Sequence, residues 1–121
     1  MTKLLRLLVI FMLPACVPPA AQGLTISTYV DAMRGRDLHD IRVENNQRLG
    51  TTLKVTAADV YVGVQHVIVL QAPPGREGTS LAGYFDGYKA QKYTIAGRHN
   101  LLLVADPGVQ KEIVEAFEAL Q

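Results

Sequence analysis

Apolar side chains recur with a helical period at both ends of the region 24–121. The first helical face is formed by Ile26, Tyr29, Val30 and Met33, at positions i, i+3, i+4 and i+7. Thr25 or Ser27 supplies a hydroxyl cap, and Gly35 marks an end. A second face, near the C-terminus, is formed by Val109, Ile113, Ala116, Phe117 and Leu120. Asp106-Pro107 predicts the start of that helix, as a cap followed by a first-turn proline.

Between these helices the period changes to two residues, as in a strand. Leu53, Val55 and Ala57 alternate with polar residues, and Val60, Val62 and Val64 alternate in the opposite phase. The change of phase at Ala58-Asp59 predicts a bulge or a turn. The apolar run 67–70 is typical of a strand buried on both faces. We expect at least two strands within 53–70, whereas the polar stretch 36–50 indicates only a turn at Asn45-Asn46.

The second half of the chain predicts a loop, a short helix and a hairpin. Residues 72–78 are rich in proline and glycine and indicate a loop. Ser80 is placed to cap a short helix with Leu81, Tyr84, Phe85 and Tyr88 on one face. Segments 93–96 and 101–104 predict two strands joined through a turn at 97–100.

The predicted elements define a single small α+β domain over residues 24–121. Paired strands separated by helices favour a two-layer sandwich. Its sheet is expected to be antiparallel or mixed, with about four strands, and the N- and C-terminal helices pack on one face of it. About one hundred residues are enough for one core without disulfides.

The first residues differ from this domain and have the pattern of a secretory signal peptide. Lys3 and Arg6 precede an unbroken apolar run over 7–13, and small residues and prolines follow. The uncharged stretch 7–21 contains three prolines and is too short for a spanning helix, which needs about 17–25 apolar residues. We therefore assign residues 1–15 to the signal peptide and 16–23 to a linker.

Leu13-Pro14-Ala15-Cys16 resembles the lipobox of bacterial lipoprotein precursors. Leu13 and Ala15 match its pattern, and Pro14 departs from the usual small or hydroxyl residue. The resemblance implies lipidation of Cys16, cleavage before it, and membrane attachment through acyl chains, which is stable when two or more are present. Val17 is not the aspartate that often retains such proteins in the inner membrane. The implied location is the periplasmic side of the outer membrane.

A conventional signal peptidase is the alternative, with a cut site at Ala21-Gln22-Gly23. The product would then be a soluble periplasmic or secreted protein. In either case the charge of the mature chain is small. The full chain carries a net charge of +1, and cleavage before Cys16 removes Lys3 and Arg6, leaving ten basic against eleven acidic residues. This balance does not favour binding to nucleic acid.

Residues that carry chemistry are sparse. The single cysteine excludes an intrachain disulfide and a Cys-rich zinc site. His39, His66 and His99 have no metal-ligand spacing, and no nucleophile or nucleotide-binding motif is present. We predict no catalytic residues, no metal and no cofactor. The alternative is an envelope hydrolase of an unfamiliar kind, in which His66 or His99 meets a carboxylate in a concave pocket.

Aromatic residues cluster between 84 and 93, interleaved with glycine and lysine. Tyr84, Tyr88 and Tyr93 form a candidate binding surface, as exposed aromatic rings stack on sugars or anchor a peptide. A glycan-binding module requires these rings to be exposed and roughly coplanar. The alternative is that helical spacing sends them into the core.

Taken together, these patterns favour a small exported protein, lipid-anchored in the bacterial cell envelope and without enzymatic activity. We expect it to bind a protein partner, as an accessory factor of a secretion, pilus or conjugation machine. An exposed sheet edge that accepts a peptide strand is one form of such a surface. A glycan-binding module and a periplasmic hydrolase remain alternatives.

Overall fold

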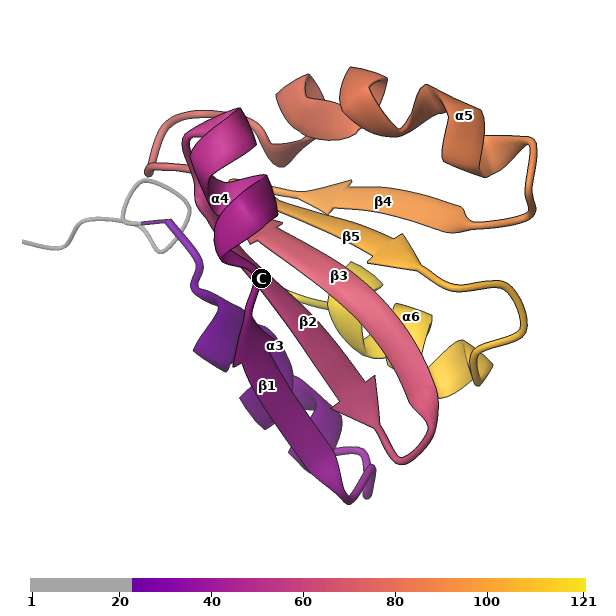
Figure 1. Cartoon of the computed structure of the whole chain (residues 1–121). Helices are drawn as coiled ribbons and strands as arrows, with labels where there is room; N and C mark the ends of the chain where they lie inside the picture. Colours follow the sequence, from indigo (N-terminus) through magenta and orange to yellow (C-terminus); the bar gives the residue numbers. More distant parts are fainter. Residues whose placement is uncertain (1–22) are drawn as a thin grey trace, which may run out of the picture.

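The computed structural model describes residues 23–121. The predicted signal peptide, Cys16 and residues 17–22 of the linker lie outside them. The described chain forms a five-stranded antiparallel sheet in the order β1-β2-β3-β5-β4 (Figure 1). The α+β class is therefore confirmed, with one strand more than expected. No helix within 23–121 has the length and apolar character needed to cross a membrane.

Helix α3 (Ile26–Arg34) follows the predicted periodicity, and its four buried residues are those of the predicted apolar face. Thr25 caps it through a capping box, because the Thr28 N–H donates to the Thr25 hydroxyl at 3.2 Å and the Thr25 N–H donates to the Thr28 hydroxyl at 3.3 Å. Gly35 is the C-cap, as predicted.

The stretch 36–50, for which the sequence indicates only a turn at Asn45-Asn46, contains a strand and the start of a helix. Strand β1 (Ile41–Asn45) is followed directly by helix α4 (Gln47–Leu53). Asn46 is the N-cap of α4 and accepts from the Leu49 N–H at 3.0 Å. The hydrophobic pattern predicts neither element, because four of the five β1 residues are exposed and Leu49 alone is buried in α4.

Strands β2 (Thr56–Val62) and β3 (Gln65–Gln71) form a hairpin with continuous pairing. The predicted bulge or turn at Ala58-Asp59 is absent from this pairing, because Leu53 belongs to α4 and Val55 precedes β2. The turn lies at Gly63-Val64, and Val64 is fully exposed rather than part of the alternation. Residues 67–70 are buried on both faces, as predicted.

A 3₁₀ helix η2 (Gly78–Phe85) and the short helix α5 (Asp86–Lys89) occupy the predicted short-helix region. Ser80 does not cap it, because its hydroxyl donates back to the Glu77 carbonyl at 2.7 Å. Strands β4 (Thr94–Arg98) and β5 (Leu101–Ala105) form the expected hairpin, with the turn reduced to His99 and Asn100. Gly78 packs directly against the backbone of Leu101, leaving no room for a side chain.

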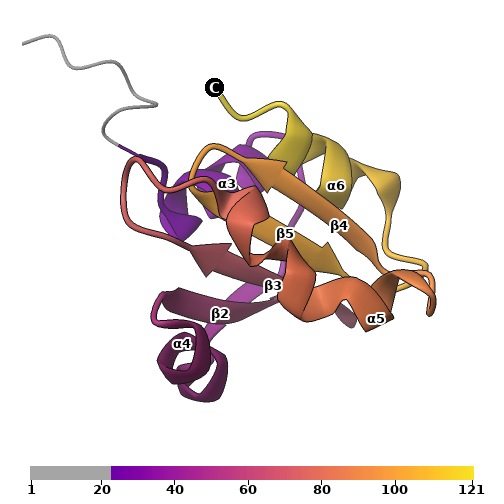
Figure 2. The same cartoon turned by 90° about the horizontal axis from the view of Figure 1, so that it is seen from above.

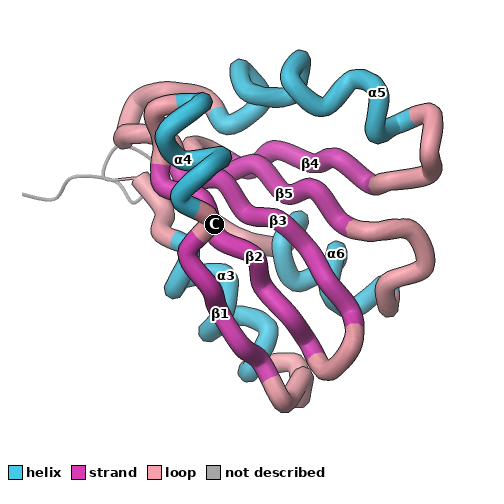
Figure 3. The backbone as a smooth tube through the Cα atoms, in the orientation of Figure 1, coloured by secondary structure: helices cyan, strands magenta, loops and turns pink. Residues whose placement is uncertain are grey.

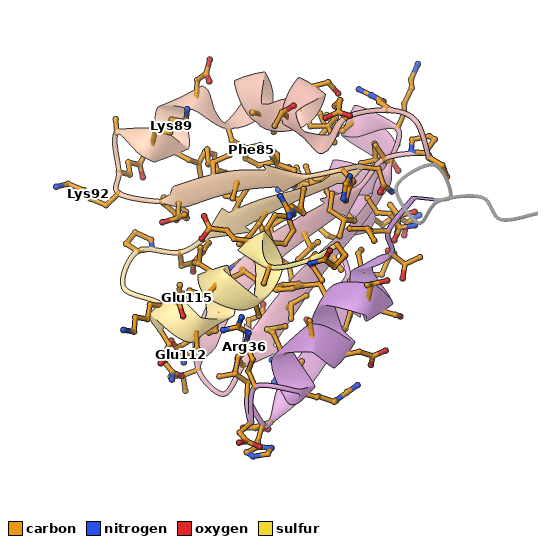
Figure 4. The ribbon with its side chains drawn as sticks, turned by 180° about the vertical axis from the view of Figure 1, so that it is seen from behind. Arg36, Phe85, Lys89, Lys92, Glu112 and Glu115 are labelled. Carbon is orange, nitrogen blue, oxygen red and sulfur yellow. The ribbon has the colours of Figure 1, made fainter. Side chains whose placement is uncertain are left out.

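Helix α6 (Lys111–Glu118) begins later than Asp106-Pro107 predicts. Gln110 is its N-cap position, and residues 106–109 form a turn between β5 and the helix. The Asp106 carboxylate lies instead against His66. The apolar face of α6 is as expected, with Ile113, Ala116 and Phe117 buried. Glu115 pairs with Arg36, just past α3, at 3.8 Å (Figure 4).

Helices lie on both faces of the sheet, whereas the sequence indicates one face only (Figures 2 and 3). Helices α3 and α6 cover one face over a core that includes Tyr29, Val60, Val69 and Phe117. On the opposite face a second core gathers under α4 and η2; its members include Leu49, Leu70, Leu81, Phe85 and Leu102. Figure 1 views this second face, which α4 and η2–α5 cover only in part.

Candidate binding surface

The part of this second face that lies towards the β2–β3 turn carries a row of polar side chains. Arg42 of β1 is paired with Tyr61 of β2, Tyr61 with His66 of β3, and the Asp106 N–H donates to the His66 carbonyl at 3.2 Å. Because directly paired residues share a face, these four side chains form one line across the sheet. We call them the polar row: Arg42, Tyr61, His66 and Asp106.

His66 is held at the centre of this row by two carboxylates. Its Nε2 lies 2.7 Å from Asp59 Oδ1 and its Nδ1 lies 3.0 Å from Asp106 Oδ1. A protonated imidazole donates from both ring nitrogens, whereas a neutral one has a single donor. The arrangement therefore suits imidazolium. Burial lowers the pKa of His66, but the hydrogen bonds and charges of Asp59 and Asp106 outweigh it, and the net pKa is raised.

The neighbours of His66 are themselves held in place. Asn46 donates to the second oxygen of Asp59 at 3.1 Å. Tyr61 stacks against the imidazole with ring centroids 5.0 Å apart, and the Arg42 guanidinium lies 4.4 Å from the centre of the Tyr61 ring. Arg42 also donates to Glu44 at 2.9 Å. Charged groups of both signs thus continue from the sheet centre to the edge strand β1.

This geometry is poorly suited to acid–base catalysis. Both ring nitrogens of His66 face protein carboxylates, so neither is directed at a substrate proton. Four shallow depressions of the described surface are lined by residues other than His66, Asp59 and Asp106. Within residues 23–121 no three side chains of the metal-ligating types converge on one point. His66 thus meets carboxylates, as the hydrolase hypothesis requires, but outside these depressions.

Among residues 23–121, strand β1 is an open edge of the sheet. The Asn46 N–H donates to the Ala57 carbonyl at 2.8 Å, and the Gly63 N–H donates to the Asp40 carbonyl at 3.0 Å. Antiparallel pairing alternates, so the even-numbered residues between these positions bond to β2. The N–H and C=O groups of Ile41, Val43 and Asn45 therefore point away from β2, to the free edge.

A groove with a mixed polar and apolar lining accompanies this edge on the α3 side of the sheet. Val43 is 47% exposed, although its apolar side chain belongs to the face that carries α3. Beside it lies a groove of about 220 Å³ lined by Ile26, Ser27, Val30, Asp31, Arg34 and Val43. A strand added to β1 would place alternate side chains over this groove.

The rings of the predicted aromatic surface are not coplanar. Tyr84 is 49% exposed, while Tyr88 and Tyr93 are partly buried against the second core. Tyr88 and Tyr93 meet edge to face at 75°, and Phe85 meets both Tyr84 and Tyr88 at 73°. Phe85 points inwards below η2 (Figure 4). Each ring therefore packs edge to face against the next one, and Tyr84 is the ring most open to solvent.

The other sequence candidates lie apart from the polar row. His39 is exposed before β1, and the His99 ring lies 2.7 Å from the C-terminal Gln121 carbonyl. Cys16 lies outside the described residues. Sequence reasoning noted His66 but missed Asp59 and Asp106 as its partners. The alternation of Ile41 and Val43 with Arg42 and Glu44 is the signal that identifies β1.

Comparison with protein-family models, with curated proteins and with solved structures finds no match. Function is therefore inferred from the chain's own residues.

Proposed function

We propose that this chain is a small lipid-anchored protein of the bacterial envelope that acts without enzymatic chemistry, by binding a protein strand along β1. The observation that carries the proposal is the free edge itself. Ile41, Val43 and Asn45 direct their backbone hydrogen-bonding groups outwards, and the half-exposed side chain of Val43 lies beside a groove with a mixed polar and apolar lining. Backbone bonds supply affinity in such strand addition, and pockets for alternate side chains supply specificity.

The lipobox-like Leu13-Pro14-Ala15-Cys16 supports the anchoring part of the proposal. Acyl chains on Cys16 would place the domain at a membrane surface, where a short-lived contact with a membrane-bound partner is favoured by raised local concentration. The arrangement of His66 supports the non-enzymatic part, because both of its nitrogens face carboxylates of the protein itself.

The anchor is tested by the intact mass of the protein purified from the envelope, beside the Cys16→Ser variant. We expect a mature chain that begins at Cys16 and carries the added mass of acyl chains, and we expect the variant to lack it. An unmodified chain that begins near Leu24 would contradict the anchor.

Strand binding is tested by a photo-activated cross-linking amino acid placed at position 43 in living cells. Position 64 is the matched control, because Val64 is fully exposed in the β2–β3 turn and lies off the β1 edge. We expect a covalent protein adduct from position 43 and none above background from position 64. Equal yields from the two positions, or no adduct from position 43, would show that β1 is not the binding edge.

A further inference from the structure

We propose that the strand bound at the β1 edge is β1 of a second copy of this chain, related by a two-fold axis that passes beside Val43. The two sheets would then join into one continuous ten-stranded sheet. The proposal rests on the proposed function only in taking β1 as the binding edge, and it adds the identity of the partner.

The backbone of β1 is compatible with this pairing. A two-fold axis at Val43 sets Val43 opposite Val43 of the second copy, and sets Ile41 opposite Asn45. These are the three residues whose N–H and C=O groups point to the free edge. They therefore meet as hydrogen-bonded pairs, which is the relation that antiparallel strands require. A register shifted by one residue would set outward-facing groups against inward-facing ones.

The side chains of β1 are complementary to themselves in the same register. Arg42 falls opposite Glu44 of the second copy, and Glu44 falls opposite its Arg42. These are non-hydrogen-bonded pairs, in which side chains of antiparallel strands approach most closely. Both side chains are more than half exposed, with 60% and 52% of their surface accessible. The intrachain Arg42–Glu44 pair at 2.9 Å would thus extend into a network of four alternating charges.

The opposite face of β1 is also suited to a second copy. The two-fold axis is perpendicular to the sheet, so the α3 helices of both copies lie on one side of it. The Val43 side chains of the two copies would then lie beside each other, next to the grooves that contain Ile26 and Val30. Each groove also carries one acid and one base, Asp31 and Arg34, so the contact brings together no excess of either charge.

Charge exchange at 42 and 44 provides the test. In Arg42→Glu both positions are acidic, and in Glu44→Arg both are basic, so each variant sets like charges against its own copy. We expect the dimer dissociation constant of either to rise roughly tenfold or more. The double exchange Arg42→Glu/Glu44→Arg restores opposite charges and should restore the dimer. Lys89→Glu, an exposed change of charge on α5, is the control.

The two single variants should also pair with each other when mixed, because an acidic edge then meets a basic one. One variant carries an affinity tag, the chains are purified in mild detergent from the envelope, and native mass spectrometry counts the copies over a concentration series. Thermal unfolding of each variant verifies that the fold is intact. Pairing of the mixture without pairing of either variant alone is the expected result, and a loss of folding would not produce it.

The register is tested by Val43→Cys. The Cα atoms of a hydrogen-bonded antiparallel pair lie about 5.5 Å apart, within the range that a disulfide spans. We expect oxidation to link two copies through position 43, as identified by peptide mapping, and Val64→Cys to give no comparable product. A wild-type chain that stays monomeric at every concentration overturns the inference. If position 43 cross-links to a different protein in cells while the chain is monomeric, strand binding stands and the two-copy inference fails.

Discussion

His66 and Asp106 are forty residues apart in the chain, and their side chains meet at 3.0 Å. Together with the 2.7 Å contact to Asp59, this contact ties the turn before α6 to the β2–β3 hairpin. Both contacts depend on the protonation of one imidazole, so the stability of the fold is coupled to pH at this point.

The pH dependence has a defined sign. The folded pKa of His66 is raised above the unfolded value of about 6.5. The stabilisation is therefore fully present below about pH 6.5 and is lost as the pH rises through the folded pKa. We expect His66→Gln to remove this pH-dependent stabilisation. The measurement is the unfolding free energy in urea of wild type and variant, at pH values from below about 6.5 to above the folded pKa of His66. His39→Gln, at an exposed position, is the control. A wild-type and variant difference that does not change with pH would contradict the coupling.

Tyr29 allows the contribution of one buried hydroxyl to be separated from that of its ring. Its hydroxyl donates to the Ile113 carbonyl at 2.7 Å, and burial raises its pKa, so it stays a donor. The ring packs edge to face with Phe117 at 5.3 Å. We expect Tyr29→Phe to lower the unfolding free energy by about 1 kcal/mol, and Tyr29→Ala by about 3–5 kcal/mol. Equal losses in the two variants, measured by urea unfolding, would place the whole effect in the hydroxyl.

Asn100, in the β4–β5 turn, joins the start of the domain to the residue that follows β3. It is 3% exposed, it accepts from the Leu24 N–H at 2.6 Å, and it donates to the carbonyls of Leu24 and Ala72 at 2.8 Å each. We expect Asn100→Ala to lower stability by about 1–3 kcal/mol for each backbone group left without a partner. Asn46→Ala, which removes a part-buried cap and the amide contact to Asp59, should cost only about 1–2 kcal/mol in total. The order of the two melting temperatures checks this expectation.

Replacement by alanine is expected to affect stability differently at two glycines of η2. A Cβ at Gly78 would overlap the Leu101 carbonyl group, whereas a Cβ at Gly83 would have no neighbour within 4 Å. Gly78→Ala therefore forces β5 away from η2 and should destabilise strongly. Gly83→Ala should be neutral or slightly stabilising, since it reduces the entropy of the unfolded chain. Comparable unfolding midpoints for the two variants would contradict the close packing at Gly78.

The periodic elements could be predicted because each buries one continuous face. Helix α3 and the apolar face of α6 follow their 3.6-residue pattern, and the β4–β5 hairpin follows its apolar runs. Strand β1 was missed because an edge strand leaves both of its faces exposed, so Arg42 and Glu44 dominate its composition. Helix α4 depends on the Asn46 cap and on Leu49, which is too few apolar residues for a periodic signal.

The two carboxylates beside His66 could not be predicted as its partners, because neither is close to it in the sequence. Asp59 lies seven residues before His66 and Asp106 forty residues after it, so only the pairing of β2, β3 and β5 brings them together. Asp106-Pro107 has the form of a helix cap, but the aspartate serves His66 instead. A local motif and a tertiary contact compete for the same side chain there, and the tertiary contact prevails.

The strand order β1-β2-β3-β5-β4 has a consequence for how the chain reaches its native state. β2–β3 and β4–β5 are local hairpins with short turns. β3 pairs with β5 from Val67–Ala105 to Gln71–Leu101, and the chain between them contains η2, α5 and β4. Hairpins close within microseconds, while contacts distant in sequence must first overcome the entropy of loop closure. We expect the β3–β5 seam to be the late, rate-limiting event. Truncations of β3 or β5 side chains at this seam should then slow folding more than they accelerate unfolding.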